Sequence, residues 1–433
     1  MNENINTWYG FVPKNWHLER LQWHLDEIKE MNNPIQTNYI LSLTNKLGVV
    51  PYSEKGNQGN VAKENLEGYK IAYPDTIVAN SMNVLIGSVG YCKYYGCVSP
   101  VYYVFKGNKI SNIFFLNYIF QTEVFQKELR KYANGILEIR LRVSSADILK
   151  REVPIPSLSI QNKIVEVIDK KISKIDALIE NENKQIEKLE EYKKAIITKA
   201  VTKGLDPNAK MKDSGVQWIG EIPEKWIIEP LKVHFQFSKG LPITKENLAA
   251  DGIKVISYGQ IHAKYNHCTF LTDELYRFVS STYLKTNPEC LVNKGDFIVA
   301  DTSEDIEGTG DFIHINKSER IFAGYHCIIL RNFSNMYSNY FAYLFMSDIW
   351  RNQFRCKVGG VKLFSLTQRI LSTTQILIPN QNEQQQIVDY LDEKCAKIRR
   401  IIEIKRNKIE KLQTYKKSLI YEYVTGKKEV SNA

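Results

Sequence analysis

The sequence predicts an α+β protein with two α/β domains, related by pseudo-two-fold symmetry and joined by two long antiparallel coiled-coil helices. Three observations predict this class. A short tryptophan-containing motif occurs twice, a helical sequence of about 40 residues occurs twice, and each interval between them alternates strand-like with helix-like segments. A chain of 433 residues has room for two or more such domains.

The first repeat opens each half of the chain. The sequence "TWYGFVPKNWHLERL" begins at Thr7, and "QWIGEIPEKWIIEPL" begins at Gln217. The shared framework positions lie 210 residues apart: Trp8, Gly10, Pro13 and Trp16 in the first copy, and Trp218, Gly220, Pro223 and Trp226 in the second. Because two tryptophans around a Gly and a Pro can bury a large area, we expect the motif to anchor a loop onto a helix or sheet rather than to stack on bases.

The second repeat closes each half. The segments that begin at Pro156 and Pro379 align without a gap, and 19 of the 42 positions that follow from Gln161 and Gln384 are identical. The copies lie 223 residues apart, so the second half has a body that is 13 residues longer. A duplicated unit with shared ends and divergent middles follows from these two repeats.

The repeated helical segments have apolar residues at alternating steps of four and three. The resulting seam positions are Ile168, Ile172, Ile175, Ile179, Glu182, Ile186 and Leu189 in the first copy, and Leu391, Cys395, Ile398, Ile402, Lys405, Ile409 and Leu412 in the second. A sustained period of 3.5 residues predicts a coiled coil, and about 40 residues without Gly or Pro predict a length of ~60 Å. The alternative is that each helix lies on the surface of its own domain.

Two charged residues interrupt the apolar seam at equivalent positions. Glu182 and Lys405 lie near the middle of their helices and carry opposite charge. Pseudo-two-fold symmetry requires the helices to be antiparallel, and equivalent mid-helix residues then meet at the axis. We therefore expect an ion pair that adds little stability but fixes register and orientation.

The bodies between the repeats have the alternation of an α/β domain. Strands are predicted at 75–80, 84–89, 99–105, 294–301 and 320–331. Helices are predicted at 112–132 and 338–358. Combined with the repeats, this pattern divides the chain into a first domain at 1–152, a helical region at 153–206, a second domain at 207–378 and a C-terminal helical region at 379–433.

The composition is that of a globular protein in a reducing compartment. The seven cysteines are scattered with no C-x-x-C, no apolar run is long enough to cross a membrane, and no basic segment before an apolar one predicts a signal peptide. We therefore expect a cytoplasmic protein without a membrane partner. The formal net charge of +10 indicates a polyanionic partner, and most of that excess lies in the two helical regions.

Motifs for catalysis or cofactor binding are missing. The sequence contains no G-x-x-x-x-G-K-[ST], no G-x-G-x-x-G after a strand and no Asn-Pro-Pro-Tyr-like segment. A nuclease core around Asp75 and Glu138 would need a lysine where Arg140 stands, and a zinc site at His262, His267 and Cys268 lacks a second ligand pair. His326 is expected to be packed or hydrogen-bonded on a strand. We predict no catalytic residue, no metal site and no cofactor bound by this chain.

These features together resemble the specificity subunit of type I restriction–modification enzymes. The resemblance rests on both copies of W-x-G-x-[IV]-P-x-x-W, on two divergent bodies ending in I-P, and on two long helices that begin near a glutamine. "GDFIVADTSED" and "NSMNVLIGSVGYCKYYGCVSPVYYVF" also look like parts of that family's target-recognition domains. One departure is that "SIQNK" lacks the acidic residue that "NEQQQ" has before its first glutamine.

The resemblance implies a function for each part. Each body would be a target-recognition domain for one half of a bipartite, asymmetric site in double-stranded DNA, and the paired helices would set the distance between the halves. Two modification subunits would supply adenine methylation with S-adenosylmethionine. Restriction subunits would join through the complex and supply ATP- and Mg-dependent translocation and cleavage.

Candidate DNA contacts are polar or basic residues in the divergent bodies, because base edges are recognised by a few donors and acceptors. They are Asn80, Ser81, Asn83, Lys93, Arg140, Arg142, Thr302, Ser303, Lys357 and Lys362. Two alternatives stay open from the sequence. One is a coiled-coil scaffold without a DNA role, and the other is a fused, type II-like restriction–modification subunit with its own activity.

Overall fold

The computed structural model describes residues 7–44, 48–56, 62, 64–135, 141–333, 337–359 and 363–430. The chain divides into two compact units: unit 1 comprises Met1–Asn183 with Lys405–Ala433, and unit 2 comprises Lys184–Ile404. The predicted segments 1–152 and 207–378 fall within units 1 and 2. The predicted helical regions 153–206 and 379–433 are each divided between the units.

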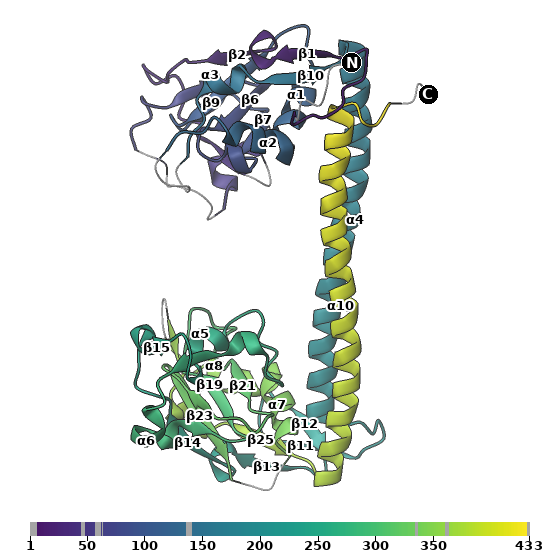
Figure 1. Cartoon of the computed structure of the whole chain (residues 1–433). Helices are drawn as coiled ribbons and strands as arrows, with labels where there is room; N and C mark the ends of the chain where they lie inside the picture. Colours follow the sequence, from purple (N-terminus) through teal and green to yellow (C-terminus); the bar gives the residue numbers. More distant parts are fainter. Residues whose placement is uncertain are drawn as a thin grey trace. The chain divides into compact units, whose positions relative to one another are not determined.

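Unit 1 contains a four-stranded antiparallel sheet with the order β2-β9-β6-β7. Its strands are β1 (His17–Arg20), β2 (Leu25–Ile28), β3 (Leu41–Thr44), β4 (Gly48–Pro51), β5 (Lys70–Ala72), β6 (Thr76–Asn80), β7 (Val89–Cys92), β8 (Gly96–Val98), β9 (Tyr102–Gly107) and β10 (Glu152–Ile155). Its short helices are α1 (Ile113–Phe120), α2 (Glu123–Arg130) and α3 (Ser145–Leu149). Aromatic residues of α1 and α2 pack with sheet residues in one core that also takes in the long helices, and α1 lies beside these helices in Figure 1.

Unit 2 repeats this sheet in the order β14-β23-β19-β21 and adds a five-stranded sheet, β15-β17-β16-β22-β18. Its strands are β11 (Met211–Asp213), β12 (Glu221–Pro223), β13 (Ile227–Pro230), β14 (Phe235–Lys239), β15 (Leu248–Ala249), β16 (Ile253–Ile256), β17 (Arg277–Val279), β18 (Leu291–Val292), β19 (Phe297–Ala300), β20 (Thr302–Ser303), β21 (Phe312–His314), β22 (Ile321–Ala323), β23 (Cys327–Asn332), β24 (Phe364–Ser365) and β25 (Gln375–Ile378). Its short helices are α5 (Tyr258–Ile261), α6 (Tyr283–Thr286), α7 (Ser338–Met346), α8 (Asp348–Arg355) and α9 (Gln368–Ser372).

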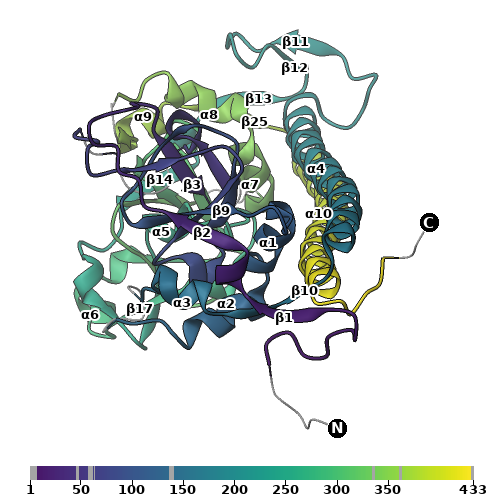
Figure 2. The ribbon, with the colours of Figure 1, turned by 90° about the horizontal axis from the view of Figure 1, so that it is seen from above.

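The long helices are α4 (Leu158–Lys203) and α10 (Gln381–Val424). In unit 1 the first part of α4 shares a core with the last part of α10, and in unit 2 the last part of α4 shares one with the first part of α10. The helices are therefore antiparallel within each unit. Seen from above, α1 and α7 both lie next to the helices (Figure 2).

The burial of the seam follows the predicted period most closely near the domains. Ile168, Ile175, Leu391, Cys395, Ile398 and Ile402 are buried, whereas Ile172, Ile179, Ile186, Leu189, Ile409 and Leu412 are half-buried. In unit 1, Lys405 Nζ donates to Glu182 Oε2 at 2.9 Å, which confirms the predicted pair. Lys408 also donates to Glu182, at 2.6 Å, and was not predicted. The hydrogen bonds from the two lysines lower the pKa of the Glu182 carboxyl, which is only 4% exposed.

Three of the four motif tryptophans anchor loops as predicted, whereas Trp218 is 40% exposed. In unit 2, Trp226 is 1% exposed and its Nε1 donates to Glu383 at 3.0 Å. Glu383 is the acidic residue that the first copy lacks. In unit 1, Trp8 donates to the carbonyl of Glu152 at 3.1 Å and Trp16 packs near Phe115.

Each motif also packs on the end of the long helix that belongs to the other repeat. Gly204 and Gly426 follow α4 and α10 with φ of +71° and +73°, a left-handed conformation that favours glycine. A Cβ on Gly426 would lie 2.6 Å from Pro13, and one on Gly204 would lie 3.5 Å from Trp226. The glycine turn after each long helix therefore packs against the tryptophan motif of the other repeat.

Several predicted elements differ in detail. Segment 84–89 is not a strand: it forms a 3₁₀ turn that ends at Gly87, where φ is +83°, before β7 begins. Segment 320–331 forms two strands, because His326 lies in a turn between them with φ of +55°. The segments 112–132 and 338–358, each predicted as one helix, contain two helices each. The second helix of each pair begins after an N-cap residue, Thr122 or Ser347. In the part of the chain that is described, no helix combines the length and hydrophobicity of a membrane span.

Candidate nucleic-acid interface

Equivalent loops follow β6 and β19, which are inner strands at the same place in the two four-stranded sheets and are called the central strands below. The carbonyl of Ser81 accepts from Val143 N at 3.1 Å in unit 1, and the carbonyl of Asp301 accepts from Leu366 N at 2.8 Å in unit 2. These matching hydrogen bonds identify the loop after β6 with the loop after β19. Since the framework is the same, differences between the two loops change surface chemistry without changing the fold.

The loop after β19 borders two adjoining cavities in unit 2, of about 890 and 530 Å³. Thr302, His326 and Ser365 line both cavities. The larger cavity has an acidic lining, with Glu304, Asp305, Glu307 and Asp311. The smaller one includes the cations Lys239 and Arg369. The cavities together form a groove, called the unit 2 groove below, whose acidic part offers hydrogen-bond acceptors.

One side of the unit 2 groove is held by a network around Asp311. His262 Nδ1 lies 3.0 Å from Asp311 Oδ2, His262 Nε2 lies 2.8 Å from the carbonyl of Thr302, and Arg351 donates to Asp311 at 2.7 Å. The hydrogen bond to Asp311 raises the pKa of His262. Burial opposes ionisation of Asp311, but His262 and Arg351 outweigh it and lower the pKa of this carboxyl. The network holds the guanidinium group of Arg351 beside the carboxylates of the loop after β19.

The predicted contact residues of unit 2 are distributed unevenly. Thr302 and Ser303 both line the groove; Ser303 is 5% exposed, and its Oγ accepts from Asp305 N at 3.3 Å. Lys357 is exposed after the end of α8. Lys362 lies outside the described residues.

The predicted contacts of unit 1 divide into buried and exposed residues. Asn80 and Ser81 are 7% and 4% exposed, and the Asn80 side chain accepts from Met82 N. Both residues form the start of the loop, and their contact with DNA stays a prediction. Asn83, Lys93 and Arg142 are exposed, and Arg140 lies outside the described residues.

The alternative catalytic and metal sites gain no support. His267 stacks on Phe270, and burial raises the pKa of the Cys268 thiol to about 11. Among the described residues, no three His, Cys, Asp or Glu side chains are grouped closely enough to hold a metal ion. Asp75 accepts from the Tyr91 hydroxyl, whereas Glu138 and Arg140 of the imagined nuclease core lie outside the described residues.

Sequence reasoning missed the polar contacts that attach each domain to its long helix. Tyr118 donates to Asp169 in unit 1, and Tyr343 donates to Asp392 at 2.5 Å in unit 2. The signal was present, because both aspartates are identical positions of the helical repeat. The network of the unit 2 groove was also missed, since Arg351 and Asp311 have no short-range motif. His326 is hydrogen-bonded as expected, to Asp301 at 3.2 Å, but in a turn rather than on a strand.

Comparisons with known proteins agree on one class. The family model of the type I restriction modification DNA specificity domain matches residues 75–190 and 223–414. The type I restriction enzyme MjaVIII specificity subunit of Methanocaldococcus jannaschii is 24% identical over 452 residues, which cover 99% of this chain and 97% of that protein.

Two solved structures share the fold. A chain from a study of complex assembly and conformational transition in a type I restriction–modification system superposes with a TM-score of 0.69 at 12% identity, covering 96% of this chain and 98% of that one. An HsdS subunit from Thermoanaerobacter tengcongensis gives a TM-score of 0.50 at 13% identity, with the same coverage. The family model thus gives the class, a DNA specificity protein, and the two structures share its fold. The chain belongs to the family of type I restriction–modification specificity subunits.

Proposed function

We propose that each domain recognises one half of a bipartite, asymmetric sequence in double-stranded DNA. One observation carries this proposal: the two units share a sheet order and the hydrogen bonds that hold the loop after the central strand, yet the loops differ in sequence and charge. A shared scaffold with different polar surfaces suits two different half-sites. The unit 2 groove supports recognition of an amino group on cytosine or adenine, because carboxylates accept hydrogen bonds from these groups in the major groove.

The experiment that tests this proposal exchanges one domain. Replacing residues 22–152 with the equivalent segment of another specificity subunit should change one half-site and leave the other intact. Methylation-sensitive sequencing of a host that carries the chimera with its modification subunits gives both half-sites directly. A change in both halves would contradict independent recognition by two domains.

The paired helices are proposed to set the spacer between the half-sites. Four residues add about one turn, or ~6 Å, to a helix, which corresponds to roughly two base pairs. Inserting four residues at matched positions in α4 and α10 should therefore lengthen the unrecognised spacer and preserve both half-sites. An unchanged spacer would show that another part of the complex sets this distance.

Two modification subunits are proposed to dock on the long helices, and restriction subunits to join through that complex. The support is a set of exposed apolar residues at equivalent positions in both repeats: Leu178 and Ile401 are 46% and 43% exposed, and Tyr192 and Tyr415 are 53% and 48% exposed. Duplicate apolar patches suit two copies of one partner. Changing Tyr192 and Tyr415 to lysine should reduce co-elution of the modification subunit, while the exposed, equivalent charged pair Lys188→Ala and Lys411→Ala serves as a control.

In this proposal the chain has no activity of its own. Adenine methylation with S-adenosylmethionine and ATP- and Mg-dependent cleavage belong to the partner subunits. Purified chain should show no methyl transfer, ATP hydrolysis or nuclease activity, and measurable methyl transfer would favour the fused-enzyme alternative. Filter binding of random duplexes, with and without the modification subunit, separates a DNA-recognition subunit from a scaffold without a DNA role.

A further inference from the structure

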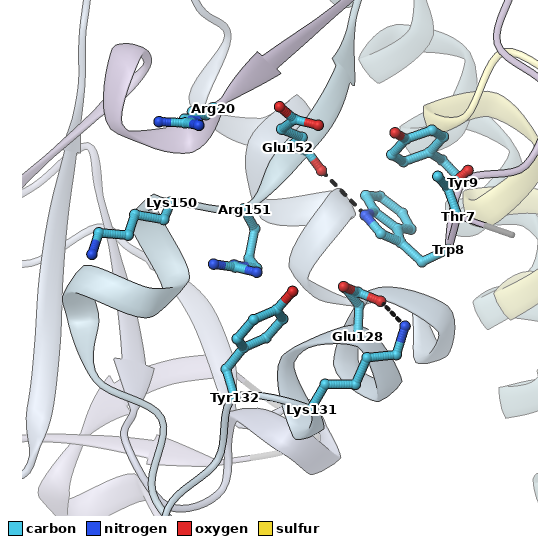
Figure 3. A pocket seen from close by; sticks show the side chains of 10 residues that line it. All are labelled: Thr7, Trp8, Tyr9, Arg20, Glu128, Lys131, Tyr132, Lys150, Arg151 and Glu152. Carbon is cyan, nitrogen blue, oxygen red and sulfur yellow. Dashed lines mark hydrogen bonds and ion pairs between the residues drawn. The ribbon is translucent and has the colours of Figure 1, made fainter. Parts of the chain in front are cut away.

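A pocket of about 330 Å³ lies in unit 1 outside the loops discussed above. Residues of the tryptophan motif, of β1 and β10, and of the ends of α2 and α3 form its walls (Figure 3). Arg20, Lys150 and Arg151 contribute cationic groups to the lining. Within the residues that the structure describes, none of these three cations forms an ion pair with a carboxylate.

Arg151 is held in one orientation. Its Nε donates to the carbonyl of Asp147 at 2.8 Å, and its guanidinium carbon lies 3.4 Å from the centre of the Tyr132 ring. Figure 3 shows the guanidinium group above that ring, in the middle of the pocket residues. The contacts use Nε and one face of the group, so the two terminal nitrogens remain for a ligand. A planar, fixed fork of N–H donors matches two oxygens of a phosphate or carboxylate.

The carboxylates of the pocket do not neutralise these cations. Glu128 pairs with Lys131 at 2.6 Å. The carbonyl of Glu152 accepts from Trp8, and its carboxylate is the remaining acidic group in the lining. The lining therefore has four cations and two carboxylates. Lys127 adds a positive charge on the exposed side of α2, the helix whose last turn contributes Glu128 to the lining.

The equivalent place in unit 2 has no such charge. The carbonyl of Arg151 accepts from Leu21 N at 3.0 Å, and the carbonyl of Thr374 accepts from Leu231 N at 2.8 Å, so Arg151 corresponds to Thr374. By the same register, Arg20 and Lys150 correspond to Pro230 and Thr373. Thr374 is 1% exposed and bonds to the carbonyl of Leu371. The fold therefore does not require cations at these three positions, and this set of cations is a feature of the first half.

We propose that this pocket binds a phosphate group and, resting on the proposed function, that the group is a phosphodiester of the DNA backbone next to the first half-site. A fixed guanidinium fork with two mobile cations beside it suits a tetrahedral oxyanion. The additional positive charge along α2 favours a polyanion over a single carboxylate. Because backbone contacts position a protein without selecting bases, the pocket would strengthen binding on one side of the site and leave the sequence recognised unchanged.

The experiment has two arms, both with the full chain. The first measures binding of inorganic tripolyphosphate by calorimetry at constant ionic strength. The second measures the affinity of a duplex that contains the site, by fluorescence anisotropy over a range of salt concentrations. The test variants are Arg151→Gln and the double variant Arg20→Gln with Lys150→Gln; the side chains of Arg20 and Lys150 are exposed and form no ion pair within the described residues. Lys232→Gln, at the matching strand–helix junction of unit 2, is the control.

We expect the test variants to bind tripolyphosphate with an affinity lower by roughly tenfold or more, because each loses charge-assisted hydrogen bonds. The plot of log affinity against log salt has a negative slope, and its magnitude should decrease by about 1 for each phosphate-binding cation removed, with unchanged base preference. Loss in the first arm alone would still support a phosphate site and assign it to a free nucleotide or phosphate. If both arms are unchanged, the proposal is overturned; weaker binding of a partner subunit in that case would assign the pocket to an acidic protein segment. Wild-type chain that fails to bind DNA would reject the proposed function, and the tripolyphosphate arm would remain valid.

Discussion

The two units differ far more in their surface loops than in the contacts that join each domain to the long helices. Gln161 and Gln384 each donate from the side chain to the carbonyl of a proline five residues earlier, at 2.9 Å in both units. Each domain also uses one tyrosine to reach an aspartate of its long helix. By contrast, the loop after the central strand is mostly apolar in unit 1 and acidic in unit 2. Sequence divergence is thus tolerated where side chains face solvent and restricted where they join the domain to the helices.

Substitutions in the tryptophan motif should produce the largest difference in stability between the two units. Trp226→Ala removes a buried indole and leaves Glu383 without its donor, so unfolding free energy should fall by about 3–5 kcal/mol. Trp16→Ala should cost less, because this indole is half-buried and the first copy has isoleucine in place of the acidic partner. Chemical denaturation of the full chain measures both losses. Equal losses would show that the motif stabilises the two units in the same way.

The polar pair in the helix seam should give the next largest effect. Lys405→Glu places two carboxylates together beside a single remaining lysine, Lys408, and should lower the midpoint of thermal unfolding. Adding Glu182→Lys restores opposite charges and should recover most of the loss. Lys417→Glu, at an exposed ion pair of the same helix, is the matched control and should change the midpoint little. A double variant as unstable as the single one would show that the two side chains do not interact.

The network around Asp311 should make part of the stability of unit 2 depend on pH. The pKa of His262 is raised in the folded state, so its interaction is fully present below about pH 6.5 and is lost as the pH rises through the raised pKa. Asp311→Asn should cost about 1.5–3 kcal/mol at pH 6 and less at higher pH. Ser88 is the equivalent of Asp311 in unit 1, since their carbonyls accept matching hydrogen bonds. Ser88→Ala should show no such pH dependence, and a constant cost for Asp311→Asn across this range would remove His262 from the explanation.

The tyrosine contacts should give the smallest and most similar effects. Tyr118→Phe and Tyr343→Phe each remove one hydrogen bond to an aspartate and should each cost about 1 kcal/mol. Chemical denaturation measures both losses, which should be equal because the two units share these contacts. A difference well beyond the error of the measurement would mean that one domain is held to its helix by other contacts.

The sequence predicted the elements that repeat, and it failed where contacts join distant residues. The helical repeat gave both long helices to within a few residues, because a heptad pattern is local. The Glu182–Lys405 pair was predictable because symmetry relates two positions. Lys408 was missed, since it lies outside the seam positions and reaches in with a long side chain.

The sheet orders and the unit 2 groove could not be predicted in the same way. Strands of three to six residues define neither their neighbours nor which sheet they join, as the division of segment 320–331 between two sheets demonstrates. Asn80 and Ser81 were expected to contact DNA because they are polar, yet they form the start of a loop and are buried. Polarity alone does not distinguish a surface side chain from one that satisfies a nearby backbone group.

The packing of each tryptophan motif on the helix end of the other repeat bears on whether half of the chain can fold alone. Residues 1–206 contain the motif of Trp16 but not the turn at Gly426 on which it packs. They also contain the helix end at Gly204 without the Trp226 that packs on it. Two copies of this fragment could therefore complete each other, each giving its helix end to its neighbour. Sedimentation of the 1–206 fragment should show a dimer, and a stable folded monomer would contradict this expectation.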